Sequence, residues 1–172
     1  SLFRGTPLAG LIKGPVDPTV TEGIEDTPYA FKHLSVAGSE FPAKIPPLWW
    51  RSVGHSGNAF VVETFLAQLA RAAEKDPLIL RRELLTKEPR ALAALNLAAD
   101  KAQWQKPLPS GLHRGIAVHK SFNTWVAQVA FVRINADNTF KVEKVVCAVD
   151  CGIAVNPDVI RAQMEGAIGM GL

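Results

Sequence analysis

The sequence predicts an α+β fold, because its two halves differ in the spacing of their apolar residues. Apolar side chains recur at helical spacing over residues 58–104, whereas residues 112–149 show the pattern of extended strands. An Asn-Pro pair at residues 156–157 then opens a last helix. No internal repeat is present, so we expect helices, then an antiparallel sheet, then one C-terminal helix.

The composition is that of a globular protein with a substantial core. Of 172 residues, 48% are hydrophobic and 20% are charged, which excludes intrinsic disorder. No apolar run reaches the ~18 residues that a membrane-spanning helix needs. The net charge is +3, but the compact basic pair Arg81-Arg82 is followed by Glu83. We therefore expect a solvated helix face of mixed charge there, and no nucleic-acid surface.

Residues 1–47 are predicted to be irregular and to pack on the rest of the protein without a core of their own. Turn-forming stretches occur at residues 16–19 and 26–29, and three prolines lie between residues 42 and 47. A weak alternation over residues 30–36 is compatible with one short strand.

Three helices are predicted between residues 58 and 104. Each begins at a residue or pair that favours a helix N-terminus, namely Asn58, Asp76-Pro77 and Glu88-Pro89. In the first helix, apolar positions begin at Val61. In the third helix, the apolar positions expected on one face are Leu92, Leu95, Leu97 and Trp104.

Three strands are predicted at residues 115–119, 125–135 and 139–149, with a hairpin turn at residues 136–139. Cys147 lies among valines in the last strand, so it is expected to pack as a small hydrophobe. Neither its spacing to Cys151 nor the spacing of the four histidines indicates a disulfide or a metal site. The last helix carries Gly166, Gly169 and Gly171, each costing about 1 kcal/mol relative to alanine. Close approach of a backbone or ligand is therefore expected there.

Residues 48–58 combine two tryptophans, Arg51 and several small residues immediately before a helix. A helix N-terminus preceded by serine and glycine offers backbone N–H groups to an anion. Arg51 adds a planar donor group for phosphate or carboxylate. The alternative is an ordinary capped helix with Arg51 in a structural salt bridge.

Residues 150–157 lead from the last strand through a glycine turn into the last helix, where Gln163 and Glu165 lie among small residues. The Gln163 amide can both donate to and accept from the polar edge of a ligand. The alternative is a helix packed closely on a neighbour, with Gln163 satisfying backbone groups.

Three motifs carry a family resemblance: Trp-Arg-Ser-Val-Gly-His-Ser at 50–56, Cys-Ala-Val-Asp-Cys-Gly-Ile-Ala-Val-Asn-Pro at 147–157, and Gln-Met-Glu-Gly-Ala at 163–167. With them, the sequence resembles the molybdopterin-binding large (beta) subunit of the xanthine oxidase superfamily. The nearest branch is that of isoquinoline 1-oxidoreductase beta subunits and bacterial aldehyde dehydrogenases. Residues 48–172 would then form a partial molybdopterin-binding domain.

The resemblance implies an oxidoreductase that oxidises aldehydes or hydroxylates N-heterocycles, with water as the oxygen source. It implies a molybdenum–molybdopterin cytosine dinucleotide cofactor and an iron–sulfur small subunit as partner. The cofactor-binding residues that it implies are Arg51, Ser52, Val53, Gly54, Gln163 and Gly166. It also favours a periplasmic or membrane-associated location over a cytoplasmic one.

The catalytic base implied by the resemblance is a glutamate in a Gly-Glu-Pro loop, which these 172 residues do not contain. Glu165 matches a helix glutamate of the family instead, and neither Glu63 nor Glu143 matches the base. The chain is thus expected to be an internal fragment, inactive and without bound cofactor alone, with edges through which copies can associate. The alternative is a non-catalytic binding or scaffold module of the same fold.

Overall fold

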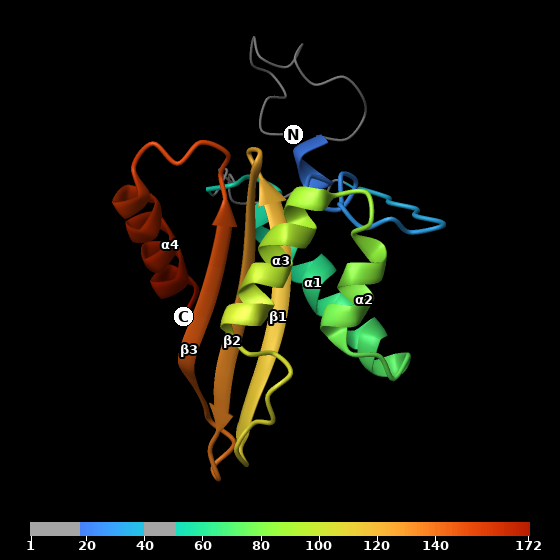
Figure 1. Cartoon of the computed structure of the whole chain (residues 1–172). Coiled ribbons are helices and arrows are strands. Elements are labelled where there is room, and N and C mark those ends of the chain that lie inside the picture. Colours follow the sequence, from blue (N-terminus) through green and yellow to red (C-terminus); the bar gives the residue numbers. More distant parts are fainter. Residues whose placement is uncertain (1–17, 40–50) are drawn as a thin grey trace, which may run out of the picture.

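The computed structural model describes residues 18–39 and 51–172 (Figure 1). Its elements in chain order are η2 (Pro18–Val20), α1 (His55–Ala72), α2 (Pro77–Leu84), α3 (Pro89–Lys101), β1 (Leu112–Ser121), β2 (Thr124–Ile134), β3 (Phe140–Asp150) and α4 (Pro157–Gly171). The predicted α+β fold, with helices followed by an antiparallel sheet and a C-terminal helix, is confirmed. The expectations for residues 1–17 and for the tryptophans and prolines of residues 40–50 lie outside the described residues.

The three strands form one antiparallel sheet in the order β1-β2-β3. Phe122 and Asn123, both with positive φ, form the two-residue turn between β1 and β2. The second hairpin turn is the predicted one, where Asp137 accepts a hydrogen bond from the Thr139 backbone N–H. Because β2 is antiparallel to both neighbours, β1 and β3 run in the same direction and finish at one end of the sheet (Figure 1).

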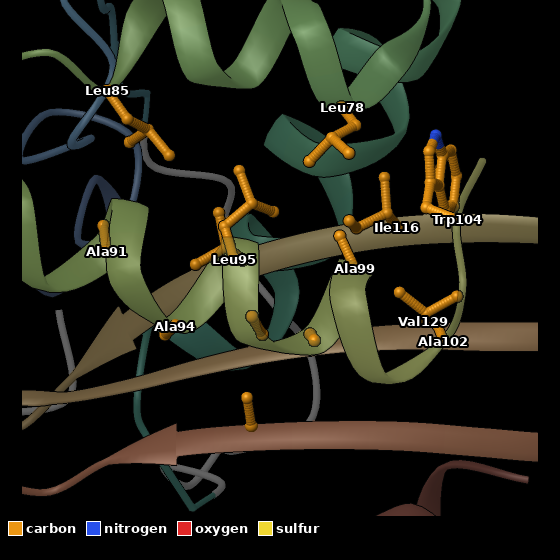
Figure 2. Close-up of a cluster of buried hydrophobic side chains, with 14 of the residues drawn as sticks. Leu78, Leu85, Ala91, Ala94, Leu95, Ala99, Ala102, Trp104, Ile116 and Val129 are labelled. Carbon is orange, nitrogen blue, oxygen red and sulfur yellow. The ribbon is translucent and has the colours of Figure 1, made fainter.

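Helix α3 covers one face of this sheet with a row of small side chains (Figure 2). Its buried residues are Ala91, Ala94, Leu95, Ala98 and Ala99. Opposite them lie Ile116 of β1 and Val129 of β2. The expectation that Leu97 shares the buried face is wrong, since this side chain is 49% exposed. At about 100° per residue, Leu97 points away from the face that carries Leu95 and Ala98.

The opposite face of the sheet, here called the back face, is only half-buried. In the row near the C-terminal ends of β1 and β3, His119 of β1 pairs with Val126 of β2, which pairs with Val149 of β3. A second row runs from Ala117 through Gln128 to Cys147. Alternation along each strand places these side chains away from α3. The back face is therefore the part of the sheet that α3 leaves open.

A buried ion pair joins α1 to α2. Arg81 is 0% exposed and donates from Nε to Glu63 Oε2 at 3.0 Å and from a terminal nitrogen to the Glu63 backbone carbonyl at 3.0 Å. Tyr29 donates its hydroxyl to Glu63 Oε1 at 2.5 Å, and the Val118 backbone N–H donates to Glu63 Oε2 at 3.1 Å. The prediction of a solvated face at Arg81 is therefore wrong, because a carboxylate on another helix compensates its burial.

Four helix starts are predicted in the described residues, and two of them have the expected side-chain cap. Asp76 accepts from the backbone N–H of Leu78 at 2.7 Å and begins α2. Asn156 accepts from the backbone N–H of Asp158 at 3.1 Å and begins α4. Glu88 precedes Pro89 as predicted but makes no side-chain cap. None of the helices in residues 18–39 and 51–172 is both long and apolar enough to cross a membrane.

Two further expectations are wrong. Helix α1 begins at His55, and Asn58 lies inside it, donating its side-chain amide to the carbonyls of Val20 and Glu22 at 2.9 and 2.7 Å. The short strand at residues 30–36 does not form. The Ala30 N–H donates instead to the Leu84 carbonyl, so this segment is hydrogen-bonded to the C-terminal end of α2.

Removing the Glu63 carboxylate is expected to cost about 3–5 kcal/mol of unfolding free energy, because Arg81 would be left buried without a counter-charge. The matched control is Glu83→Ala on α2, which removes an exposed ion pair with Lys75 and is expected to cost less than about 1 kcal/mol. Urea unfolding of Glu63→Ala and Glu83→Ala measures both. Equal, small losses in the two variants would contradict the role given to Glu63.

Candidate functional site

The backbone immediately before α1 is strained. Ser52 and Val53 both have positive φ, at 65° and 49°. This left-handed region costs a non-glycine residue about 1–2 kcal/mol, and a β-branched side chain such as that of Val53 is rare there. Such conformations persist where the surroundings impose them, and they are concentrated at functional sites. Residues 51–54, here called the 51–54 turn, are therefore a candidate site on geometry alone.

The surroundings of Gly54 show what holds this turn. A Cβ atom at Gly54 would lie 2.0 Å from the Thr19 carbonyl oxygen, so only glycine fits. The Gly54 N–H donates to Glu22 Oε2 at 3.3 Å. The next two N–H groups, of His55 and Ser56, donate to carbonyls of the turn itself at 3.0 and 3.3 Å. The Glu22 carboxylate thus already lies at the positive end of α1, where the helix dipole favours a negative charge.

Arg51 supplies the positive charge of the turn. Its guanidinium is exposed and makes no ion pair with any residue of the described ranges. Ser52, Val53 and Gly54, which follow it in the chain, are half-buried. Because guanidinium binds carboxylate and phosphate through two parallel hydrogen bonds, Arg51 suits an anionic ligand.

A second turn, at residues 150–157, is anchored by an arginine that sequence reasoning missed. Arg90 donates from Nε and a terminal nitrogen to the two carboxylate oxygens of Asp150, at 2.9 and 2.8 Å. The Gly152 N–H also donates to Asp150, at 2.9 Å. These donors, Arg90 above all, lower the pKa of Asp150 to about 2. The available signal was the position of Arg90 in the first turn of α3, where a cation is unfavourable without a carboxylate.

The two turns lie at the same end of the sheet. His55, the residue after the 51–54 turn, contacts His119 near the end of β1. His119 belongs to the row that ends at Val149, next to Asp150 on β3. Two strand spacings of ~4.8 Å separate β1 from β3, so roughly 10 Å of back face lies between the two anchoring points. The fold thus brings together two segments that are about a hundred residues apart in sequence.

Helix α4 continues from the second turn along the outer side of β3 (Figure 1). A groove of about 610 Å³ lies between them, lined by residues that include Cys147, Val149, Met164 and Ile168. No residue of α4 is buried. Gln163 and Gly166 are exposed, and no hydrogen bond joins Gln163 to the 51–54 turn within the part of the chain that the structure describes.

The glycines of α4 have open space around them. A Cβ atom at Gly166, Gly169 or Gly171 would meet nothing within 4 Å. The close approach expected at these positions is therefore not made by any of the described residues.

Cys147 and Cys151 are free thiols, and burial raises the pKa of Cys147. No group of three or more metal-ligating side chains gathers anywhere in residues 18–39 and 51–172.

Comparison with known proteins decides the family. The model of the molybdopterin cofactor-binding domain matches residues 59–172. The chain belongs to this family. The match covers α1 beyond its first turn, helices α2, α3 and α4, and the whole sheet. These elements are therefore part of a molybdopterin cofactor-binding domain.

Three similar proteins are named as an oxidoreductase or a dehydrogenase, or as a subunit of one. The beta chain of isoquinoline 1-oxidoreductase of Brevundimonas diminuta is 34% identical over 72% of this chain and 16% of its own length. A nicotinate dehydrogenase chain of Pseudomonas putida is 30% identical over 96% of this chain and 16% of its own. A membrane-bound aldehyde dehydrogenase [pyrroloquinoline-quinone] of Gluconacetobacter polyoxogenes is 34% identical over 73% of this chain and 19% of its own. This member of the molybdopterin-binding family therefore spans less than a fifth of these relatives.

Replacing Arg90 is expected to return the pKa of Asp150 from about 2 toward its ordinary value of 3.8. Since the pKa is lowered in the folded state, ionised Asp150 stabilises the fold above about pH 4, and this contribution is lost as the pH falls toward 2. An NMR titration of the Asp150 carboxyl carbon in Arg90→Gln measures the shift. Arg161→Gln, which removes only an exposed pair with Asp158, is the control, and an unchanged Asp150 titration in Arg90→Gln would contradict the anchoring.

Proposed function

We propose that this chain forms part of the wall of a molybdenum cofactor site in a larger oxidoreductase subunit. The observation that carries the proposal is the strained 51–54 turn, with its exposed Arg51, at the same sheet end as the 150–157 turn. The family match and the oxidoreductase names of all three relatives support it.

Bare apolar surfaces support the view that this chain works within a larger subunit. Helix α1 exposes Phe60, Val61 and Phe65 to 72, 52 and 57%. Helix α4 has no buried residue although it carries several apolar side chains. Large exposed apolar patches are unusual on an independent soluble domain and are normal where another part of a protein packs.

The groups offered by the 51–54 turn and by α4 suit a pterin dinucleotide. The Arg51 guanidinium suits a pyrophosphate or a carboxylate, because it offers paired donors and has no carboxylate partner among the described residues. The Gln163 amide suits the mixed donors and acceptors of a pterin ring. Gly166 leaves open space beside α4 where a ring edge has room to approach. Ser52, Val53 and Gly54 set the direction in which Arg51 points.

The proposed cofactor is molybdenum–molybdopterin cytosine dinucleotide. When bound, it supplies the two-electron oxidation of an aldehyde or N-heterocycle carbon, with water as the oxygen source. The residues of this chain bind and orient it, and we assign no acid–base role to any of them. Glu63 is committed to Arg81, and Glu143 pairs with Arg133 on the sheet surface.

The proposal extends to partners and location. We infer an iron–sulfur small subunit that receives the electrons and a periplasmic or membrane-associated enzyme. The subunit organisation implied by the names of two relatives and the membrane-bound third relative support these inferences.

Arg51→Ala and Gln163→Ala, made in the larger subunit, are each expected to lower its molybdenum content about tenfold, because each removes a direct polar contact to the cofactor. Elemental analysis of the purified proteins measures this. The matched controls are Arg71→Ala and Gln105→Ala, which change exposed residues away from the two turns. Unchanged molybdenum in both site variants would remove these residues from the site and favour a non-catalytic scaffold.

The 172-residue chain alone is expected to show no oxidation of aldehydes or N-heterocycles with a dye acceptor. The reason is that it contains no Gly-Glu-Pro loop with the glutamate that the family resemblance identifies as the base. Turnover above a no-protein control, with or without added molybdenum, would show that this chain holds a complete active site.

A further inference from the structure

Two histidines meet beside the 51–54 turn. His55 is the first residue of α1, and His119 lies 64 residues later on β1. Nδ1 of His55 and Nε2 of His119 are 3.0 Å apart, and the rings are edge-on, with centroids separated by 5.2 Å. Since His55 directly follows Gly54, this contact connects the sheet to the strained turn.

A glycine lies under both rings. Gly23 has a φ of 84°, and a Cβ atom there would lie 3.0 Å from Nδ1 of His55 and 3.3 Å from Nε2 of His119. From the same segment, the Glu22 carboxylate accepts from the Gly54 N–H, and the Glu22 carbonyl accepts from Asn58. Residues 19–23 thus contact the turn and the start of α1, and His119 contacts the same region from the sheet.

We propose that His119 is a positioning residue that, through its ring contact with His55, holds the 51–54 turn in the left-handed conformation that presents Arg51. This inference rests on the proposed function in one respect only, namely that the 51–54 turn binds a cofactor. His119 itself is half-buried on the back face and acts through His55.

The chemistry of the contact makes it sensitive to protonation. A hydrogen bond between two ring nitrogens needs a lone pair on one of them, so it is lost when both rings are protonated. Burial, and then the neighbouring His55, lower the pKa of His119 to about 4. The contact is therefore stable at neutral pH and weakens as the pH falls through about 4.

The charged groups around the two histidines do not remove this dependence of the contact on pH. Asp26 acts on His119 in the opposite direction and raises its pKa, but less than burial lowers it. Glu22 is bound to the Gly54 N–H. On β1, Lys120 points to the other face of the sheet, where it lies over the Trp125 ring. On β2, the residue paired with His119 is the uncharged Val126.

The test uses the full 172-residue chain, labelled with ¹⁵N. In the wild type at pH 7, long-range ¹H–¹⁵N spectra should show complementary tautomers for His55 and His119. Either Nδ1 of His55 or Nε2 of His119 should carry a proton, and the other nitrogen of this pair should carry none. The amide hydrogens of His55 and Ser56, which bond within the turn, report its integrity by hydrogen exchange. Corrected for the intrinsic rate, their protection should fall as the pH drops through about 4.

Three variants separate positioning from general stability. In His119→Leu, protection of His55 and Ser56 should fall at least tenfold while the β2 amides keep theirs. His119→Gln, whose amide can still bond to His55, should stay within about threefold of the wild type. The control is His113→Leu, which changes a histidine at the far end of the same strand and should alter nothing.

Several results would overturn the proposal. They are unchanged protection in His119→Leu, equal loss in the Gln and Leu variants, or wild-type tautomers that are not complementary. The tautomer result decides the matter even where His119→Leu fails to fold. If the turn loosens in His119→Leu but Arg51→Ala leaves the molybdenum content of the larger subunit unchanged, the proposed function fails and the positioning role stands.

Discussion

The carboxylate of Glu63 accepts hydrogen bonds from three separate parts of the chain and is itself almost fully buried. Tyr29 contacts it from the N-terminal segment, Arg81 from α2 and the Val118 N–H from the outer edge of β1. Burial raises the pKa of this carboxyl, and the positive charge of Arg81 opposes that rise. The arrangement fixes the position of α1 along β1 more closely than apolar packing alone would, because each donor needs its acceptor in one place.

The placement of α1 determines where its N-terminus lies. With Glu63 beside Val118, the start of the helix reaches His119 on the same strand, and the 51–54 turn comes to the sheet end where Asp150 is held by Arg90. The strain at Ser52 and Val53 is then a consequence of a turn bound from several sides. The buried contacts of the molecule thus hold the exposed Arg51 in position, although the contacts of Arg51 itself contribute little to the stability of the fold.

Local signals in the sequence predicted local structure well. Asp76-Pro77 and Asn156-Pro157 begin helices because their caps and prolines act within a few residues. Contacts between distant segments could not be predicted: Arg81 looked solvated because its partner Glu63 is on another helix, and Asn58 looked like a cap because its acceptors lie in residues 20–22. In the candidate site, composition and resemblance indicated the 51–54 turn. The left-handed Val53 contradicts its own conformational preference, and the contact between His55 and His119 has no local signal.

The position of molybdenum relative to the sheet tests most directly whether the two turns form part of the cofactor site. In crystals of the larger subunit with its cofactor, anomalous scattering at the molybdenum edge locates the metal without reference to the fold. A peak is expected at the sheet end formed by Ser121 and Asp150, on the side of the 51–54 turn. A peak at the opposite end, near the hairpin between Ile134 and Phe140, would contradict it.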